Sequence, residues 1–339
     1  MTIIDIQNIY RRLLKIYAHI GPNATILTKH PEFAEQNPDG SFICTKWNFP
    51  KLDFKCEGLR EYLYSNMMYY ISAFDVDGFR CDVGDLVPID FWQEAKRRMR
   101  AVKQDSVLIN EGSLYDRMSV AFDASYCYTW HSVLYNIFCS SEPAYLLKDC
   151  YETIAPKLPK NALLLRDIDN HDTVTDWPQR VEVAATNDGM EQIEVINYLI
   201  DGIPMVYCGN ELACTAKLSM FSNRFYKGDF EVTNRNNKTS VAAERRISVF
   251  KKLNSLKAES DLLRWGETVW LDTDENDSII AFKRIYKNEK IVFIGNTKNC
   301  EVTTILPENV SLSVLLENNV ALSKDSVTFG SFGYVAYLV

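Results

Sequence analysis

Several features that would assign this chain to a special class are absent from its sequence. The opening, Met1–Leu14, lacks the basic start, apolar stretch and small-residue cleavage site of a signal peptide. No apolar run is long enough to cross a bilayer. The nine cysteines are scattered, odd in number and without a C-x-x-C pair, which argues against a disulfide framework or a zinc site. We therefore expect a protein of the reducing cytoplasm that does not contact membranes, unless an export signal was lost with a missing front end.

Clustered positive charge is also scarce. The chain has 37 Lys and Arg against 45 Asp and Glu, a formal net charge of −8, whereas phosphate binding requires gathered cations. The one basic cluster, Lys96–Arg100, follows a helical pattern and is better explained as a solvated helix face. We therefore expect no nucleic-acid partner. With 339 residues, 47% of them hydrophobic, the chain can bury a large core.

Apolar runs alternate with amphipathic stretches over the first three quarters of the chain, and this alternation predicts βα units. Strands are expected at 13–18, 76–82, 107–111, 119–124, 162–168 and 203–207. Helices are expected at Leu59–Phe74, Pro88–Val102, Pro143–Ile154, Met190–Ile200 and Val241–Leu256. Residues 20–55 have no sustained period, and their apolar content favours an ordered loop excursion that walls a cleft.

The pattern changes at about residue 258. The predicted strands there are short, β-rich and separated by Asp, Asn and Gly, which suggests a small antiparallel β-sandwich. They are expected at Glu267–Leu271, Ser278–Tyr286, Lys290–Asn296, Glu301–Leu306, Ser311–Leu315 and Phe332–Leu338. We therefore predict two domains, 1–257 and 258–339.

Three apolar runs each end in a carboxylate: Asp82, Glu111 and Asp172. The sequence separation between Asp82 and Glu111 is close to one strand-plus-helix unit of a (β/α)8 barrel, and that between Glu111 and Asp172 is close to two such units, at roughly 30 residues each. Catalytic groups of such barrels lie at the carboxyl ends of different strands, so the three acids are expected on one rim. Carboxylates grouped in this way are typical of a site that cleaves glycosidic bonds.

The residues around these acids resemble the α-amylase family, glycoside hydrolase family 13. The strand motifs are GFRCD (78–82), NEG (110–112) and DNHD (169–172), and further matches are HPEF (30–33), WNFPKLDF (47–54) and GIPMVYCGNE (202–211). The resemblance implies that Asp82 is the nucleophile and Glu111 the general acid/base. It further implies that Arg80 orients the site, that Asp172 stabilises the transition state and that His171 holds substrate hydroxyls.

The front of the chain departs from the family. The strand-three motif would align with Leu14–His19, where His19 is kept but Leu14 and Ala18 replace the usual Asp and Asn. Two further βα units would need roughly 60 residues ahead of this strand. We therefore predict a (β/α)8 TIM-type barrel that lacks its first two strands. Calcium is common in the family, but the loss of the Asn argues against it here, and no metal or other cofactor is predicted.

Each site residue also has a structural explanation. Asp82 and Asp172 could cap helices after their strands, Glu111 could be a surface acid, and His171 could be a structural histidine. His19 is equally open to both explanations because its motif is eroded.

Aromatic residues near the motifs are open to two explanations as well. Trp177, and Tyr126, Tyr128 and Trp130 after the sixth strand, could stack on sugar rings or belong to the core. Glu211 resembles a family position but is interpreted as structural.

The function predicted from the sequence is a retaining hydrolase or transglycosylase of α-1,4-linked glucosides such as maltodextrins, with an α-glucan oligosaccharide as its partner. Retention requires two carboxyl groups about 5 to 5.5 Å apart. Arg80 is expected to keep Asp82 ionised while burial and neighbouring acids keep Glu111 protonated. A catalytically inactive remnant or glucan-binding paralogue is the alternative, and a purely structural sandwich protein is the third. The oligomeric state is not predicted.

Overall fold

The computed structural model describes residues 12–16, 18–217, 240–306, 313–323 and 326–339. The chain divides into two compact units. The first comprises Met1–Tyr126 and Lys157–Leu164, and the second comprises Cys127–Pro156 and Leu165–Val339. Each unit is described by itself.

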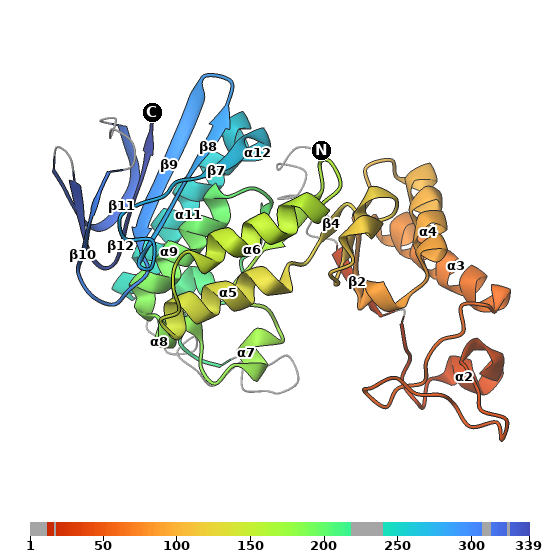
Figure 1. Cartoon of the computed structure of the whole chain (residues 1–339). Coiled ribbons are helices and arrows are strands. Elements are labelled where there is room, and N and C mark those ends of the chain that lie inside the picture. Colours follow the sequence, from red (N-terminus) through yellow and green to blue (C-terminus); the bar gives the residue numbers. More distant parts are fainter. Residues whose placement is uncertain (1–11, 17, 218–239, 307–312, 324–325) are drawn as a thin grey trace. The chain divides into compact units, whose positions relative to one another are not determined.

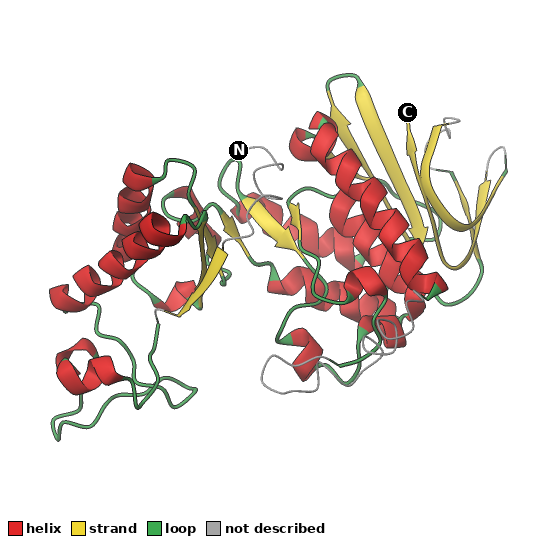
Figure 2. Ribbon diagram, turned by 180° about the vertical axis from the view of Figure 1, so that it is seen from behind, coloured by secondary structure: helices red, strands yellow, loops and turns green. Residues whose placement is uncertain are grey.

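Parallel strands form the centre of the first unit. They are β1 (Arg12–Ile16), β2 (Gly78–Asp82), β3 (Val107–Asn110), β4 (Ala124–Ser125) and the first half of β5 (Leu163–Arg166), and each pairs with the next in chain order (Figure 2). Gly78 pairs with Arg12 on one side and with Val107 on the other, so these three strands begin in line. Their carboxyl ends therefore lie at one edge.

Helices α2 (Thr25–Lys29), α3 (Glu57–Phe74) and α4 (Ile89–Val102) belong to the same unit, and α3 and α4 lie side by side (Figure 1). The buried face of α4 carries Phe91, Trp92, Ala95 and Met99, at helical spacing. Its opposite face carries the basic cluster Lys96–Arg100, whose charges are paired with Glu61, Glu94 and Asp123. The cluster is thus a paired outer helix face, as predicted.

The excursion, residues 20–55, is ordered by isolated antiparallel bridges rather than by a sheet. His19 pairs with Lys51 and Ala34 with Leu52, and both Ala34 and Leu52 are buried. A 3₁₀ helix, Pro31–Phe33, buries the Phe33 ring. These contacts give the excursion a small core of its own.

The second unit is built around α9 (Thr186–Leu199), which is buried from Gly189 onward. Two polar residues of α9 accept hydrogen bonds from other elements: Glu191 accepts from Arg245, and Asn197 accepts from the Trp130 indole. The other elements are α5 (Tyr128–Cys139), α6 (Leu146–Ile154), α7 (Thr173–Asp176), α8 (Val181–Ala184), α11 (Val241–Glu259), α12 (Asp261–Trp265), the second half of β5, and β6 (Ile203–Pro204).

An antiparallel sheet completes the second unit, where the sequence predicted a small antiparallel β-sandwich. Its strands are β7 (Glu267–Trp270), β8 (Ile279–Tyr286), β9 (Glu289–Asn296), β10 (Val302–Ile305), β11 (Ser313–Leu322) and β12 (Ser326–Leu338). The first part of β12 pairs with β10 and its last part with β9, and between them Phe332 has a φ of 49°. Hydrogen bonding therefore joins the six described strands into one sheet rather than two separate sheets.

One face of this sheet has an apolar core that includes Val292, Val327 and Tyr337. The other face lies against α9 and α12 (Figure 1), where the Tyr334 hydroxyl donates to Glu191 at 2.9 Å. Residues 311–312 of the predicted strand Ser311–Leu315 lie outside the described residues, as does Tyr17 of the predicted strand 13–18.

The described residues contain six parallel strands, β1 to β6, in chain order. The absence of two barrel strands ahead of β1 stays a prediction, as does a domain boundary at 257/258. Among the described helices, none has the length and apolar character that crossing a membrane would require.

Candidate active site

Asp82 and Glu111 lie at the carboxyl ends of two neighbouring parallel strands. Cys81 of β2 pairs with Asn110 of β3, and the Glu111 amide donates to the Cys81 carbonyl at 3.1 Å. Asp82 is the last residue of β2 and Glu111 directly follows β3, so the register brings the two acids to the same edge. This is the placement predicted from their spacing.

Arg80 joins the two acids. Its Nη1 donates to Asp82 Oδ1 at 2.6 Å, and its Nη2 forms an ion pair with Glu111 Oε1. The exposed fractions of the side chains are 11% for Arg80, 18% for Asp82 and 8% for Glu111. Burial disfavours the guanidinium cation, but Tyr126 and the two acids outweigh burial and raise the pKa of Arg80. We call these three residues the Arg80 cluster.

Val83 holds the second oxygen of Glu111. Its backbone N–H donates to Glu111 Oε2 at 2.8 Å, and its φ is +44°, a left-handed conformation that a β-branched residue rarely adopts. The strained backbone places this N–H directly beside the nucleophile candidate. The two carboxylate oxygens of Glu111 thus contact different groups, Oε1 the Arg80 guanidinium and Oε2 the Val83 N–H, and the protonated Glu111 expected from the sequence stays a prediction.

Asp85 supports the loop that carries Glu111. Its carboxylate accepts from the Asn110 amide at 2.9 Å and from the backbone N–H groups of Ser113 and Leu114 at 2.7 and 3.0 Å. Gly112 leaves room for this carboxylate, because a Cβ at Gly112 would overlap it. Sequence reasoning missed Asp85, although a glycine directly after Glu111 was a signal of such a close approach.

His19 lies in the same unit, at the start of the excursion. Its ring stacks on Phe49, with centroids 5.2 Å apart, and tilts against Trp47 at 5.4 Å. Burial lowers the pKa of His19, and the negative charge of Asp82 opposes the shift. Its Nδ1 is buried without a hydrogen-bond partner among the described residues.

Asp172 and His171 follow β5 in the second unit. The amides of Asp172 and Thr173 donate to the Asn170 side chain at 2.9 and 3.0 Å, which fixes the turn before α7. Asp172 is at the N-cap position of α7, yet its side chain makes no capping hydrogen bond and is 53% exposed. The explanation of Asp172 as a helix cap therefore finds no support. His171 Nε2 lies 3.4 Å from Asp172 Oδ1.

A buried charge cluster packs behind this turn. Arg180 donates to Asp169 at 2.9 Å, to Glu182 at 3.3 Å and to the Asn210 side chain. The side chains of Arg180, Asp169 and Glu182 are at most 1% exposed. Arg246 donates to the Asn210 carbonyl at 3.2 Å and lies 4.0 Å from Glu182. We call these residues the Arg180 cluster.

The acids of the Arg180 cluster bind protons more tightly than exposed acids. Burial, opposed by Arg180, raises the pKa of Asp169 to about 7. Glu194, which accepts from Asn210 at 3.1 Å, has its pKa raised by burial to about 8. Asp169 precedes His171 in the chain, and Asn210 follows β6. The Arg180 cluster therefore joins these two segments through side chains that are buried from solvent.

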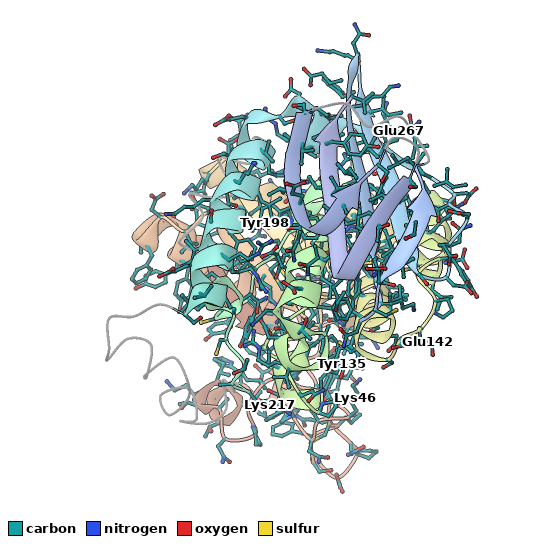
Figure 3. The ribbon with its side chains drawn as sticks, turned by 90° about the vertical axis from the view of Figure 1, so that its left-hand side faces the viewer. Lys46, Tyr135, Glu142, Tyr198, Lys217 and Glu267 are labelled. Carbon is teal, nitrogen blue, oxygen red and sulfur yellow. The ribbon has the colours of Figure 1, made fainter. Side chains whose placement is uncertain are left out.

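The remaining aromatic candidates differ in their exposure. Trp177 packs on Tyr135, with centroids 4.0 Å apart, and Lys217 donates to the Trp177 carbonyl at 2.6 Å (Figure 3 labels Tyr135 and Lys217). Trp177 is half-buried and keeps part of its ring accessible. Trp130 is fully buried under Arg166 and belongs to the core, and Tyr126 is buried beside Arg80.

The structure thus brings Asp82, Glu111, Arg80 and His19 together in the first unit. It places Asp172, His171 and Trp177 in the second unit. The convergence of these two groups at one cleft stays a prediction.

Comparisons with known proteins agree with the motifs. Residues 42–294 match the family described as "Alpha amylase, catalytic domain". A cyclomaltodextrinase of Thermoanaerobacter pseudethanolicus is 24% identical over 278 residues, which cover 79% of this chain and 45% of the relative. The chain therefore spans about half the length of the curated relatives it matches.

Two solved structures share the fold. A noncanonic maltogenic alpha-amylase from Thermotoga neapolitana has a TM-score of 0.76 at 21% identity, covering 96% of this chain and 77% of that one. An alpha-amylase from Geobacillus thermoleovorans, crystallised with acarbose, has a TM-score of 0.74 at 21% identity, covering 95% and 75%. At this level of identity the likeness extends to the fold alone.

Proposed function

The chain belongs to the alpha-amylase family, glycoside hydrolase family 13, and from this premise we propose that it is a retaining glycoside hydrolase of α-1,4-linked glucosides of the maltodextrin type. Asp82 is the nucleophile and Glu111 the general acid/base. Asp172 stabilises the transition state, and His171 holds substrate hydroxyls. The activity of a whole relative is a proposal for this chain, which matches about half of the curated relatives' length.

The observation that carries the proposal is the pairing of Asp82 and Glu111 through one guanidinium. Arg80 contacts both carboxylates, which lie at the ends of adjacent strands. One guanidinium contacts both carboxylates and so holds them near each other. The two carboxyl groups of a retaining site lie about 5 to 5.5 Å apart, and those of an inverting site about 6.5 to 9.5 Å apart. We assign the closer spacing to this pair, so that Asp82 attacks the anomeric carbon itself without an intervening water.

Glu111 supplies and then recovers the proton of the reaction. Without substrate, Glu111 pairs with Arg80 and accepts from the Val83 N–H. When a glucan binds, the Glu111 carboxyl leaves Arg80 and carries a proton taken from solvent. It donates that proton to the glycosidic oxygen as the bond from this oxygen to the anomeric carbon breaks and Asp82 forms the glycosyl ester. In the second step Glu111 takes a proton from a water that attacks the anomeric carbon and releases Asp82.

The names of the relatives support a substrate of this class. They include a cyclomaltodextrinase and a maltogenic alpha-amylase, and the structural relative from Geobacillus thermoleovorans was crystallised with acarbose. We extend to this chain only the shared element, an oligosaccharide of glucose. The alternative, an inactive or glucan-binding paralogue, is separated from an enzyme by the experiment below.

The test compares hydrolysis of an activated α-glucoside by the chain alone and by the chain fused to two βα units from a related amylase. The fusion supplies part of the relatives' length that this chain does not match, so we expect weak or no cleavage by the chain alone and clear cleavage by the fusion. In the active form Asp82→Asn should lower turnover by about four orders of magnitude, because no other residue can form the ester.

Asp176→Asn, an exposed acid on α7, is the matched control and should leave turnover unchanged. Strong cleavage by the unmodified chain would show that the added strands are dispensable. An active protein that tolerates Asp82→Asn would refute the assignment of the nucleophile, and a fusion that folds, binds a glucan and never cleaves it would favour the paralogue.

A further inference from the structure

The 83–87 segment directly follows the nucleophile candidate, and its first backbone N–H contacts Glu111. The Val83 N–H donates to Glu111 Oε2 at 2.8 Å. Val83 has a φ of 44° and a ψ of 43°, a left-handed conformation that is unfavourable for a β-branched residue. Such conformations persist only where the surrounding structure holds them. The contacts of this segment therefore decide whether the N–H stays on Glu111.

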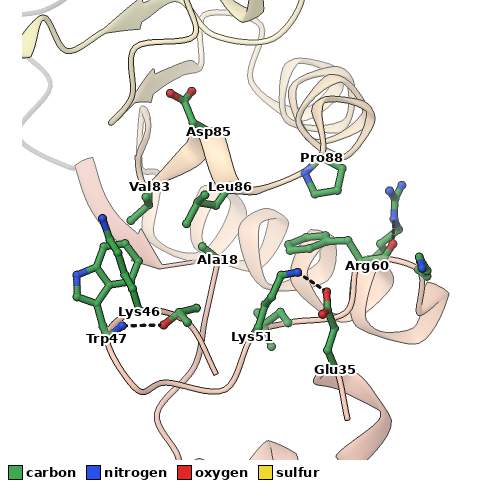
Figure 4. Close-up of a pocket in the computed structure, with 14 residues that line it drawn as sticks. Ala18, Glu35, Lys46, Trp47, Lys51, Arg60, Val83, Asp85, Leu86 and Pro88 are labelled. Carbon is green, nitrogen blue, oxygen red and sulfur yellow. Dashed lines mark hydrogen bonds and ion pairs between the residues drawn. The ribbon is translucent and has the colours of Figure 1, made fainter. Parts of the chain in front are cut away.

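The side chains of the segment contribute little to holding it. Val83 and Leu86 line a cavity of about 740 Å³ between the segment and the excursion, and Leu86 is 55% exposed. Figure 4 shows these two side chains on the side of the excursion and the Asp85 carboxylate directed away from it. A side chain that faces a cavity lacks packing partners on that side. The polar contacts of the segment therefore have to fix its conformation.

Arg117 binds two carbonyls of the segment. It lies on the 3₁₀ helix Tyr115–Ser119, in the loop after β3, and its Nη1 donates to the Val87 carbonyl at 2.8 Å and to the Gly84 carbonyl at 3.2 Å. The Trp92 indole on α4 also donates to the Gly84 carbonyl, at 3.0 Å. Hydrogen bonds from a charged donor are stronger than those from a neutral one, so we expect Arg117 to contribute most to holding the turn.

The segment also lies directly against the end of β3. A Cβ at Gly84 would overlap the Asn110 side chain, which leaves no room for a shift of the turn toward β3. The segment is thus held at its first residue by Glu111 and at its last residue by Arg117. Without Arg117 the turn can open away from β3, which relaxes the strain at Val83 and turns its N–H away from Glu111.

The Val83 N–H determines which oxygen of Glu111 carries the proton. A backbone N–H needs an oxygen with a free lone pair, and a carboxyl oxygen that bears a hydrogen is the poorer acceptor. With Val83 on Oε2, the proton is therefore carried by Oε1, the oxygen that pairs with Arg80 when no substrate is bound. In the proposed reaction the Oε1–H bond breaks, its electron pair stays on the carboxylate, and the proton passes to the glycosidic oxygen.

We propose that Arg117 is a positioning residue for Glu111: by holding the Gly84 and Val87 carbonyls, it keeps the Val83 N–H on Oε2 and leaves Oε1 to donate the proton. This inference rests on the proposed function, in which Glu111 is the general acid/base. It deepens that function by giving Arg117 a role that neither the motifs nor the comparisons assign.

The first measurement follows the contact itself and needs no turnover. Exchange of the Val83 amide hydrogen is recorded by NMR on the full chain, labelled at its valine nitrogens. Arg117→Met keeps the aliphatic stem but loses the donors, and it should speed this exchange about 10-fold or more, because the N–H leaves its acceptor. Arg97→Met is the matched control, since Arg97 is an exposed arginine of the same unit that pairs with Glu94, and it should leave the exchange unchanged.

The second measurement follows the proton, in the form of the protein that turns over. Maltotriose and α-maltosyl fluoride transfer the same maltosyl group, but glucose needs a proton to leave and fluoride needs far less help. Arg117→Met should lower kcat/KM for maltotriose about 10-fold or more and kcat/KM for the fluoride less than about threefold. Arg117→Lys, whose ammonium can donate to the same two carbonyls, should restore most of the loss. A purely structural defect would lower both values alike.

Unchanged exchange of the Val83 amide in Arg117→Met would overturn the inference, as would equal losses of kcat/KM for the two substrates. The urea midpoint shows whether each variant folds. Should Arg117→Met not fold, Arg117→Gln, with a shorter and neutral donor, takes its place in both measurements with the same expected directions.

Glu111→Gln separates the inference from the proposed function. It should show the same preference for the fluoride in a stronger form, because its amide has no proton to give to glucose. A Glu111→Gln variant that loses both substrates equally would refute the proposed function. Unchanged Val83 exchange in Arg117→Met would refute only the positioning, so the two failures are distinguishable.

Discussion

Two clusters of this protein place an arginine between acids, and they differ in what surrounds them. In the Arg80 cluster the side chains of Arg80 and Asp82 are 11% and 18% exposed. In the Arg180 cluster the side chains of Arg180, Asp169 and Glu182 are at most 1% exposed. The side chains of the Arg80 cluster are accessible to a substrate, whereas those of the Arg180 cluster contact only other residues of the chain.

The difference shows that an ion pair by itself does not identify an active site. Both clusters lie beside motifs of the family, and both contain short charge-assisted contacts. Accessibility separates them: charges next to solvent can exchange a partner for a substrate, whereas fully buried charges must keep the partners they have, because an unpaired buried charge is costly. We therefore assign chemistry to the Arg80 cluster and support of the Asp172 turn to the Arg180 cluster.

Removing Arg180 should have the largest effect on stability. Arg180→Met leaves Asp169 and Glu182 buried without their cation, and breaking a buried pair in this way typically costs about 3 to 5 kcal/mol. The free energy of unfolding, measured in urea, should fall by this amount. Arg97→Ala, which breaks an exposed pair with Glu94, should change stability little. Equal losses for the two variants would show that burial does not distinguish these ion pairs.

Gly112→Ala should have an intermediate effect on stability and a strong effect on activity. The added Cβ overlaps the Asp85 carboxylate, which cannot move without losing hydrogen bonds to the loop that carries Glu111. Overpacking of this kind costs about 1 to 3 kcal/mol. Gly21→Ala is the control, because nothing lies within 4 Å of a Cβ there. If Gly112→Ala hydrolysed an activated α-glucoside as fast as Gly21→Ala, Asp85 would have no part in positioning Glu111.

Glu194→Gln should have the smallest effect on stability at pH 5, and its main effect should be a change in the pH dependence of stability. The pKa of Glu194 is raised by burial to about 8 in the folded chain, from an ordinary value of 4.5. Between these values the folded chain keeps a proton that the unfolded chain has released, so this contribution to stability is lost as pH rises toward 8. The amide of Gln cannot ionise, and the variant should lack this loss.

Urea unfolding at pH 5 and pH 8 measures the effect. Relative to the unmodified chain, Glu194→Gln should be more stable at pH 8 than at pH 5, by on the order of 3 to 4 kcal/mol, because each pH unit between the two pKa values corresponds to about 1.4 kcal/mol. The contribution of Asp169 to the pH dependence of the unfolding free energy is the same in both proteins. Glu267→Gln, on exposed β7 (Figure 3), is the control. A variant with the same pH dependence as the unmodified chain would exclude a proton held by Glu194.

The sequence predicted those parts of the molecule that repeat along the chain or follow a local pattern. The periodicity that predicted helices at 59–74 and 88–102 is confirmed by α3 and α4. Spacing placed Asp82 and Glu111 at neighbouring strand ends, because the length of a βα unit fixes that distance. Short strands were located less well: the predicted strand 119–124 overlaps the last residue of a 3₁₀ helix and only the first residue of β4.

What the sequence could not predict are partners that only the fold brings together. Arg180 and Asn210 are far apart along the chain, and no local pattern joins them. The left-handed conformation of Val83 is equally hidden, since a valine normally indicates extended backbone. The ion pair between Arg80 and Glu111 is hidden for a similar reason, because the register that brings Glu111 to this guanidinium is a property of strand pairing.

Trapping of the glycosyl ester tests the central claim, that Asp82 is the nucleophile of a retaining site, most directly. The form of the protein that turns over is incubated with a fluorinated α-glucosyl fluoride, whose leaving group permits ester formation while the ring fluorine slows its hydrolysis. Peptide mass spectrometry then locates the sugar. The account predicts one fluoroglucosyl group on the peptide that contains Asp82 and none on the Asp82→Asn variant. A sugar found on Glu111 or Asp172, or steady turnover with no trapped ester, would contradict it.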